Sequence, residues 1–320
     1  MEDPVSTIMD TVVQPEKLLK DLARLWVDLG KQDAEKGSSG VIRACAMTLI
    51  AAVNCEDDAK GVTETIGQLM HEHPSRAIVL CIGSGAAPII ARVFAQCWMP
   101  FGGRQQICCE QIEISAGIDL LPDLPKLLLG ITVPDLPVVL WSRSPSLCEN
   151  TSFAKLFPLA DKLIFDSARF DDAEAGLALI KRLVSEGCNA ADLSWTRLTP
   201  WRETVAQIFE NEHNRKYATE IRRVGISHSG PTAGRYLASW FSHSLPSGVE
   251  ISCAPGDVAG IKLAAPEFAA SIQLDEPSSA RVTVNGITSR TPFPASSEYN
   301  LMREELSILG VDHVFRRCLP

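Results

Sequence analysis

Two glycines at the end of an apolar run are the first residues whose spacing could bind a ligand. The segment IVLCIGSGAAPIIARVF, residues 78–94, carries Gly83-Ser84-Gly85 between two apolar stretches. A dinucleotide-binding loop needs a third glycine, so that backbone and helix can approach the pyrophosphate, and an acidic residue about 20 positions later for the ribose. Those positions hold Pro88 and Gln105. The run after the loop alternates and continues through MPFGGRQ into a further alternating run, which favours a β-hairpin. We therefore expect the glycines to form a turn between strands, with a strand, loop and helix of a nucleotide-binding enzyme as the alternative.

A histidine between two serines is the next candidate. The segment GISHSGPTAG, residues 225–234, resembles a nucleophile elbow, but Ser229 stands where that motif needs its second glycine. Pro231 suits the first turn of a helix, so the pattern favours a strand that enters a helix through a polar loop. The start of such a helix could bind an anion.

The sequence also offers weak candidates for metal ligands. His71 and His73 lie at the end of an expected helix, without further ligands at metal-binding spacing. Cys108 and Cys109 are adjacent, and on a strand their side chains point in opposite directions. We expect no structural zinc and no bound cofactor.

The ten cysteines are scattered through apolar segments. A free cysteine packs as a small apolar residue, and the cytosol disfavours disulfides, so we expect buried, reduced thiols. A cysteine-based redox sensor remains an alternative, although no C-x-x-C motif indicates which thiols would serve it.

The segment DLSWTRLTPWRETVAQIF, residues 192–209, concentrates residue types that are enriched at protein interfaces. We predict that four of its residues bind a protein partner: Trp195, Arg197, Trp201 and Arg202. A structural explanation stays open beside this one. Thr199 as N-cap, Pro200 in the first turn and Glu203 in a capping arrangement would account for the local pattern, and tryptophan often closes a junction between domains.

Several segments together resemble one known family, the glucose-6-phosphate dehydrogenase assembly proteins, called OpcA. They occur in the family's order over most of the first 210 residues: RACAMTLI (43–50), HPSRAI (73–78), EQIEI (110–114), DLPVVLW (135–141), ADKLIFDSARF (160–170) and DLSWTRLTPWRE (192–203). The resemblance implies a non-catalytic partner that assembles or allosterically activates glucose-6-phosphate dehydrogenase, and so controls the oxidative pentose phosphate pathway and NADPH supply. NADP and the sugar phosphate would then bind the enzyme and not this chain. The family offers no interface residues to transfer, so the four residues above remain a prediction from residue type.

The elements expected around these segments describe an α/β protein. An amphipathic helix over 15–29 precedes a linker over 31–40, and residues 41–83 show a strand, a crossover helix and a strand, which predicts a parallel pair. Strands follow at 106–116, 136–142 and within 153–168, and helices at 172–187 and 200–212. We expect a mixed, partly parallel sheet flanked by helices.

After residue 212 the pattern changes to a second, smaller α+β domain with mostly antiparallel strands. A strand near 218–227 and a helix over 231–245 precede strand-like runs at 249–254, 260–265, 270–274 and 281–287, and a last helix spans 298–309. The expected organisation is therefore a helix and linker (1–40), an α/β domain (41–212) and an α+β domain (213–320).

Composition restricts the class of partner. The chain has 320 residues, 46% of them hydrophobic, and a formal net charge of −9. The acidic balance argues against nucleic acid as a partner. The start of the chain lacks the basic and apolar regions of a signal peptide, and no apolar run is long enough to span a membrane, so we expect a cytoplasmic protein.

Overall fold

The computed structural model describes residues 7–9, 13–35, 40–55, 57, 59–100, 105–228, 230–256, 259–276 and 278–320. The chain forms two compact units. Unit 1 comprises Met1–Phe165 and Cys188–Ala190, and unit 2 comprises Asp166–Gly187 and Ala191–Pro320. The chain thus leaves unit 1 well before residue 212, where we expected the boundary, and the N-terminal helix belongs to unit 1 and does not form a separate segment.

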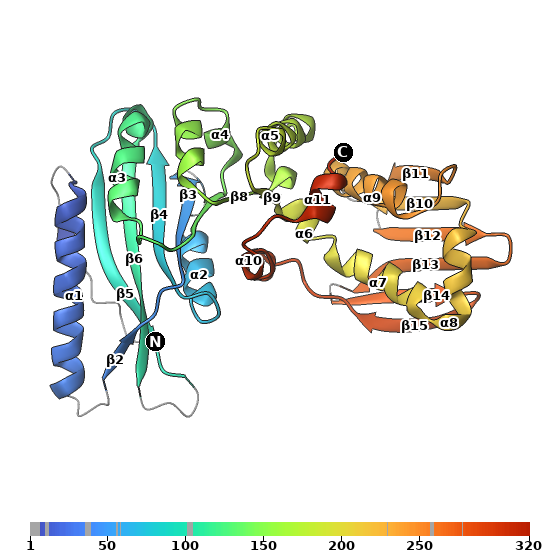
Figure 1. Ribbon diagram of the computed structural model, residues 1–320, viewed down its shortest axis with the longest axis horizontal. Helices are drawn as coiled ribbons and strands as arrows, with labels where there is room; N and C mark the ends of the chain where they lie inside the picture. Colours follow the sequence, from blue (N-terminus) through green and yellow to red (C-terminus); the bar gives the residue numbers. More distant parts are fainter. Residues whose placement is uncertain are drawn as a thin grey trace. The chain divides into compact units, whose positions relative to one another are not determined.

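Unit 1 is built on a mostly parallel sheet, which Figure 1 shows with its helices. The strand order is β1-β5-β6-β4-β3-β7-β8-β9, and β2 also pairs with β6. The pairs of β5 with β1 and with β6 are antiparallel. The strands are β1 (Thr7–Met9), β2 (Val41–Arg43), β3 (Met47–Asn54), β4 (Ser75–Gly83), β5 (Ile90–Trp98), β6 (Gln106–Gly117), β7 (Val138–Ser142), β8 (Lys162–Phe165) and β9 (Ala190–Asp192).

The order of these strands makes the sheet doubly wound. The chain first builds β4 and β6 on one side of β3, and then returns to build β7 and β8 on the other side. All but the last residue of β3 are buried, as expected for a strand covered on both faces. The helices of unit 1 are α1 (Pro15–Glu35), α2 (Ala59–Leu69), α3 (Leu124–Ile131) and α4 (Pro145–Cys148). The carboxyl ends of β3 and β7 therefore form the switch point, where open α/β sheets bind ligands.

The loop of Gly83 and Gly85 connects β4 to β5, and β5 forms an antiparallel hairpin with β6. The predicted turn between strands is confirmed, because no helix follows the loop. The first strand of the unit expected over 41–83 is instead two strands: β2 pairs with β6, whereas β3 pairs with β4 and β7. The chain crosses between these positions at residues 44–46.

Unit 2 contains a mostly antiparallel sheet of order β11-β10-β12-β13-β14-β15, in which only the β10/β11 pair is parallel among the described strands. Its strands are β10 (Arg223–His228), β11 (Glu250–Pro255), β12 (Gly260–Ala265), β13 (Phe268–Glu276), β14 (Ser279–Val284) and β15 (Ile287–Pro292). The strand expected over 281–287 is wrong, because Asn285 and Gly286, both with positive φ, form a hairpin turn between β14 and β15.

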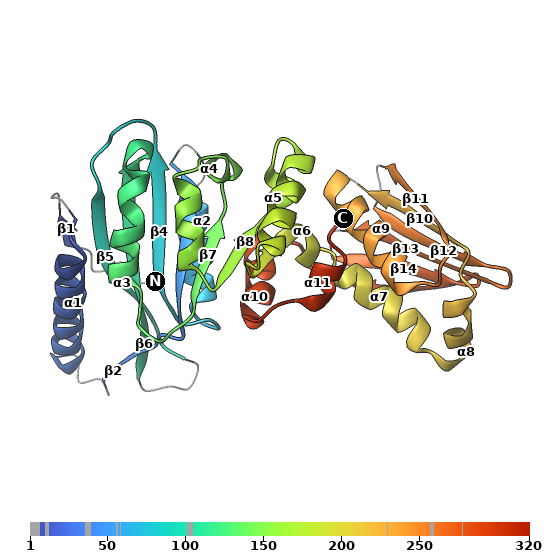
Figure 2. The same cartoon turned by 45° about the horizontal axis from the view of Figure 1, so that its top comes forward.

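The helices of unit 2 lie against one face of this sheet and at one end of it (Figures 1 and 2). They are α5 (Ala173–Ser185), α6 (Leu193–Thr196), α7 (Thr199–Glu210), α8 (Glu212–Arg215), α9 (Pro231–Ser244), α10 (Glu298–Ser307) and α11 (His313–Arg317). Side chains along the strands alternate between the two faces of this sheet. Val224, Ile226 and Leu263 are buried, whereas Arg223 and Lys262 are exposed. The expected α/β fold with a second α+β domain is confirmed.

Candidate functional site

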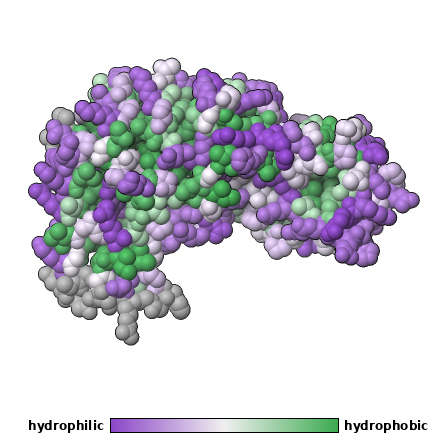
Figure 3. Space-filling view, viewed as in Figure 1, coloured by the Kyte–Doolittle hydropathy of each residue, from purple (hydrophilic) through white to green (hydrophobic). Residues whose placement is uncertain are grey.

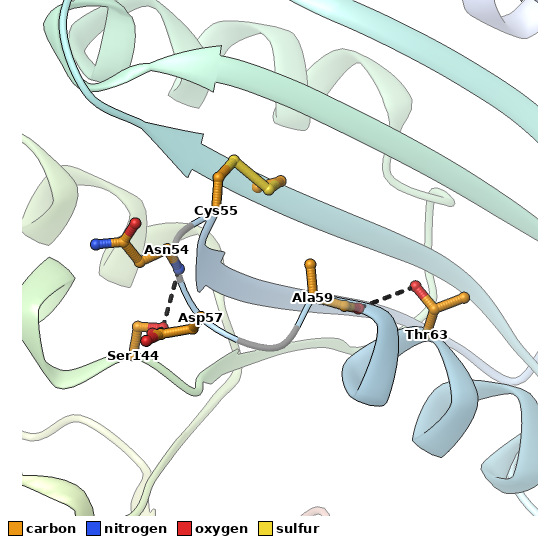
Figure 4. The surroundings of a disulfide bond; sticks show 7 residues. Asn54, Cys55, Asp57, Ala59, Thr63 and Ser144 are labelled. Carbon is orange, nitrogen blue, oxygen red and sulfur yellow. Dashed lines mark hydrogen bonds between the residues drawn. A yellow bond between two sulfur atoms is a disulfide. The ribbon is translucent and has the colours of Figure 1, made fainter.

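Polar contacts link the two loops at the switch point of unit 1 (Figure 4). The backbone nitrogen of Asn54, at the end of β3, donates a 2.9 Å hydrogen bond to Oγ of Ser144, which follows β7. The Ser144 hydroxyl in turn donates to the carboxylate of Asp57. The connection between β3 and α2 is thus tied to the loop after β7.

This arrangement does not provide a phosphate cradle. The connection after β3 reads Asn-Cys-Glu-Asp-Asp over 54–58, with three acidic residues and no glycine. The carboxylate of Asp57, which lies at this place, repels a pyrophosphate. The glycines after β4 serve the packing of the backbone instead: a Cβ at Gly117 would meet the carbonyl oxygen of Gly85 and the nitrogen of Ala87. The alternative of a nucleotide site at Gly83–Gly85 therefore lacks its helix and its open loop.

Four cysteines form disulfides, so the expectation that all thiols are reduced is wrong. Cys55 bridges to Cys81, from the loop after β3 to the neighbouring strand β4. Cys97 bridges to Cys108, its direct partner in the antiparallel register of β5 and β6. The register itself brings the two side chains together, because they point to the same face of the hairpin. Cys108 does not pair with its neighbour Cys109, as predicted for adjacent residues on a strand.

The other six cysteines form no disulfide. Burial raises the pKa of the thiols of Cys109 and Cys148 to about 11. Such thiols are protonated at neutral pH and therefore react slowly. Of these six cysteines, Cys253 is the exposed one.

The 192–203 segment lies in unit 2 and begins with a buried carboxylate. Asp192, at the end of β9, is 1% exposed. Its carboxylate accepts hydrogen bonds of 2.9 Å from the backbone nitrogens of Ser167 and Ser194, and one of 2.7 Å from the hydroxyl of Tyr236. Burial raises the pKa of Asp192, and burial beside this carboxylate raises the pKa of Tyr236 well above its ordinary value. Asp192 is the N-cap of α6 and links it to α9.

Arg197 pairs with a second carboxylate in the same unit. Its Nη1 and Nη2 atoms donate to the two oxygens of Asp166 at 3.1 and 2.8 Å. The Ser194 hydroxyl also donates to Asp166, at 3.1 Å. The guanidinium is half-buried, and the bidentate geometry fixes it against the start of unit 2.

Trp195 is buried among residues from the end of the chain. Trp195 is only 4% exposed, and its Nε1 atom donates a hydrogen bond of 3.1 Å to the carboxylate of Asp312. The ring lies 5.9 Å from that of Phe315, and the guanidinium carbon of Arg202 stands 3.7 Å from the centre of the indole. Trp195 thus connects α6 to α11.

Arg202 completes this contact from α7. It donates at 2.9 Å to the carbonyl oxygen of Trp195 and to Oγ1 of Thr199, and burial lowers its pKa to about 10. Thr199 is the first residue of α7 and makes no capping bond, so the predicted N-cap role is wrong. Pro200 lies in the first turn, as predicted. Trp201 is 6% exposed and packs its ring 5.0 Å from that of Phe293.

The four residues predicted to bind a partner therefore lie in one unit, but both indole rings are buried inside it. Trp195 holds the last helix, α11, through Asp312 and Phe315, a role different from the capping and domain-junction roles considered from the sequence. That the four residues bind a partner stays a prediction. Sequence reasoning missed the other half of this arrangement, namely Asp312 and Phe315 with the exposed residues around them. The signal that could have indicated it is the run Ile308-Leu309-Gly310-Val311, which is apolar in a short polar region.

The other sequence candidates do not form a site. Within the described part of the chain, no group of three or more histidine, cysteine and acidic side chains could hold a metal ion. His71 packs against the ring of Trp98 at 4.8 Å. His228 packs against Gly234 of α9, and its neighbour Ser229 lies outside the described residues. No helix in the described ranges is long and apolar enough to cross a membrane.

Two family models match this chain, one after the other along the sequence. Residues 67–182 match the family model described as the glucose-6-phosphate dehydrogenase subunit N-terminal domain, and residues 188–319 match the one described as its C-terminal domain. A relative described as "Putative OxPP cycle protein OpcA" from Synechocystis sp. is 30% identical over 175 residues, which cover 53% of this chain and 36% of the relative. A relative of the same description from Nostoc punctiforme is 29% identical over 141 residues, which cover 43% of this chain and 30% of the relative. The matched part thus spans only about a third of these relatives.

Among solved structures, similarity is remote. Gal80p from Saccharomyces cerevisiae is 10% identical, with a TM-score of 0.49 and 84% of each chain covered. KijD10, a 3-ketoreductase from Actinomadura kijaniata, is 9% identical, with a TM-score of 0.48 and 85% of this chain and 94% of that chain covered. Neither likeness is close enough to argue from. The two family matches, in order along the chain and supported by the relatives, show that the chain belongs to the glucose-6-phosphate dehydrogenase assembly protein (OpcA) family.

Proposed function

We propose that this chain is a non-catalytic partner of glucose-6-phosphate dehydrogenase that promotes its assembly and activates it allosterically. It would thereby control NADPH supply from the oxidative pentose phosphate pathway. The observation that carries the proposal is that two consecutive family models, both described as domains of a glucose-6-phosphate dehydrogenase subunit, match residues 67–182 and 188–319. The aromatic and charged side chains of the 192–203 segment, through which the sequence most resembles the family, bind Asp166, Asp312 and other groups of the chain itself.

The mechanism follows from differential binding. A partner that binds only the active conformation or oligomer of an enzyme raises its population by the difference in affinity between the states. A tenfold preference corresponds to about 1.4 kcal/mol. Activation should then appear as a lower KM for the sugar phosphate or as a larger active fraction, without any chemistry on this chain.

The test uses the dehydrogenase from the same organism. Initial rates are measured against sugar phosphate concentration with and without an equimolar amount of this chain, and the mixture is analysed by size-exclusion chromatography with light scattering. An unrelated protein at the same concentration is the control for crowding and surface effects. The proposal predicts a co-eluting complex and a shifted KM or active fraction. Absence of both, under oxidising and reducing conditions, would contradict it.

A nucleotide-binding enzyme is the competing class, and the acidic loop at the switch point argues against it. Titration of the isolated chain with NADP, followed by calorimetry, distinguishes the two. The proposal predicts no saturable binding up to millimolar concentration, whereas a nucleotide enzyme would saturate well below it.

A second candidate function is redox control of the same partner, and the Cys55–Cys81 disulfide favours it because Cys55 is exposed. Activation of the dehydrogenase would then differ between oxidised and reduced chain. The variant Cys55→Ser with Cys81→Ser should remove that difference, and Cys253→Ser, at an exposed free thiol, is its control. Equal activation by oxidised and reduced wild-type chain would exclude this candidate.

A further inference from the structure

One face of the unit 2 sheet is open to solvent. Its other face carries the buried side chains of Ile226 and Phe268, and it is covered by helices: α9 contacts β10, and the ring of Phe209 in α7 lies 5.5 Å from that of Phe268. The strand residues that alternate with the buried ones are odd-numbered in β10, β13 and β14 and even-numbered in β11, β12 and β15. All of these except Gly260 are exposed or half-buried, and we call this surface the open face.

Charge distinguishes the open face from the rest of the chain. Its charged residues are the basic Arg223, Lys262, Arg281 and Arg290 and the acidic Glu250 and Asp275. Four positive and two negative groups give the face a net charge of +2, on a chain whose net charge is −9. Figure 3 shows hydrophobic residues interspersed with hydrophilic ones on the side of the molecule that it presents, so apolar area alone does not indicate a docking surface there.

Two of the arginines are held in a fixed arrangement. Arg281 and Arg290 are direct partners in the register of β14 and β15, where like charges destabilise a sheet unless a third group compensates. Asp275 is that group, because its two carboxylate oxygens accept hydrogen bonds of 2.5 Å from Arg281 and 2.8 Å from Arg290. The hydrogen bond from Arg281 lowers the pKa of Asp275, so the carboxylate is charged at neutral pH. The cluster retains one positive charge, and its arginine side chains are 46% and 65% exposed.

The rest of the open face is flat. Between the charged groups it carries small residues, among them Gly225, Ala269 and Ser271, which do not project far from the sheet. A partner surface can therefore approach the strands closely. Six strands spaced about 4.8 Å apart, with about six residues each at 3.4 Å, cover roughly 600 Å². A partner that covers this face buries about 1,200 Å² in total, which is the lower end of the range for stable specific interfaces.

We propose that the open face docks an acidic surface of glucose-6-phosphate dehydrogenase. The identity of the partner rests on the proposed function, whereas the chemistry of its surface follows from the positive charge of the open face. Carboxylates of the partner would pair with Lys262 and with the fixed arginines beside Asp275. Because those arginines are already oriented, they lose little conformational entropy when they bind.

Charge also decides between this occupant and two others. A second copy of this chain could cover the same area, but two open faces of net positive charge repel each other. Nucleic acid is attracted to basic surfaces, but sheets that bind RNA stack its bases on aromatic side chains. The residues of the open face include no aromatic side chain, and the net charge of the whole chain repels a polyanion. An acidic protein surface is the occupant that fits both the local charge and the residue types.

The experiment reverses charge on the open face of the full chain. The test variant combines Lys262→Glu with Arg290→Glu, and its control combines Arg215→Glu in α8 with Lys60→Glu in α2, two exposed positions outside the open face. A third variant, Ser271→Tyr, places a bulky side chain on the flat part of the face without changing its charge. Each variant is titrated into purified dehydrogenase by calorimetry at low and at high salt. Circular dichroism melting checks that each variant is folded.

We expect the test variant to raise Kd at least tenfold at low salt and Ser271→Tyr to raise it at least fivefold, whereas the control stays within about threefold of wild type. Salt should weaken binding of the wild type more than binding of the test variant. A wild-type chain that does not bind the enzyme would overturn the proposed function, and this inference with it. Wild-type binding together with an unchanged Kd for the test variant, or with an equal effect of the control, would overturn this inference alone.

Two further measurements test the other occupants. Light scattering of the chain by itself would overturn the inference if it showed a wild-type dimer that the test variant converts to a monomer, because the open face would then join copies of the chain. Titration with a labelled single-stranded RNA of mixed sequence would overturn it if the wild type bound the RNA and the test variant did not. We expect the same oligomeric state for both chains, and no saturable binding of the RNA by either.

Discussion

The Nε1 atom of Trp195 donates a hydrogen bond of 3.1 Å to Asp312, which lies 117 positions later in the chain. With Arg202 stacked over the ring of the indole, this bond ties α6 to the last helix of unit 2. Trp195, which we predicted from its residue type to contact a partner, is buried and belongs to the framework of unit 2. Residue type alone could not distinguish the two roles, because tryptophan is enriched both in interfaces and in domain cores.

Asp312 should contribute more to stability than an ordinary helix cap. Asp312→Ala removes the cap of α11 and also leaves the Trp195 N–H without its acceptor, so we expect a loss of about 2–3 kcal/mol in the free energy of unfolding. Asp172→Ala is the matched control, because Asp172 caps α5 through a bond to Glu174 alone. It should cost about 1 kcal/mol. Urea unfolding measures both, and equal losses would show that the indole bond adds nothing.

Replacing Arg202 by lysine should also destabilise unit 2. The guanidinium stacks on Trp195 and donates to two acceptors at once, and an ammonium cannot reproduce that planar arrangement. We expect Arg202→Lys to lower the free energy of unfolding by about 1–2 kcal/mol. Arg215→Lys, on the exposed helix α8, should change it by less than about 0.5 kcal/mol. Comparable effects of the two substitutions in urea would contradict the importance of the stacked contact.

Alkaline pH should destabilise the folded chain. The thiols of Cys109 and Cys148 have a pKa near 11 when folded against 9.0 in the unfolded chain, because burial disfavours the thiolate. Between these values the unfolded chain has lost protons that the folded chain keeps, so stability falls as pH rises from 9 towards 11. The raised pKa of Tyr236 acts in the same direction above pH 10. Urea midpoints at pH 8, 9.5 and 10.5 should decrease in order, and Cys148→Ala should weaken the trend. A flat profile would contradict it.

Much of the fold could be predicted because it depends on local patterns. The hairpin of β5 and β6 follows from alternating side chains, and the crossover from β3 to β4 follows from a change of period between strands and helix. The turn at Asn285 and Gly286 could also be predicted from the sequence, because an Asn-Gly pair suits a type I′ hairpin. The prediction of one strand over 281–287 overlooks this pair. Here the pattern was sufficient, and its interpretation was wrong.

Other features depend on contacts that no local pattern contains. The pairing of Cys97 with Cys108 requires the register of two strands, and that of Cys55 with Cys81 requires the order of strands in the sheet. The division between the units could not be placed because residues 188–190 return to unit 1 after a stretch that belongs to unit 2. The bond from Trp195 to Asp312 is of the same kind, because it joins residues far apart in the sequence.

The disulfides can be counted directly. Chain purified without reductant, denatured and titrated with a thiol reagent should show six thiols, because four of the ten cysteines are bridged. The same titration after complete reduction should show ten. Peptide mapping by mass spectrometry should then identify the pairs Cys55–Cys81 and Cys97–Cys108. Ten thiols before reduction, in chain handled without reductant throughout, would show that neither bridge forms.

The glycines around the β4–β5 loop should prove necessary for packing and not for binding phosphate. A Cβ at Gly117 would collide with backbone atoms of Gly85 and Ala87, which cannot move aside as a flexible side chain could. We expect Gly117→Ala to lower the free energy of unfolding by about 1–3 kcal/mol, as overpacking does in other cores. Gly30→Ala is the control with the opposite sign: this glycine lies within α1 with open space around it, and alanine should stabilise the helix by about 0.5–1 kcal/mol. Urea unfolding of both variants tests the pair. If Gly117→Ala were as stable as wild type, close backbone packing would not explain this glycine, and a ligand that approaches the loop would have to be considered again.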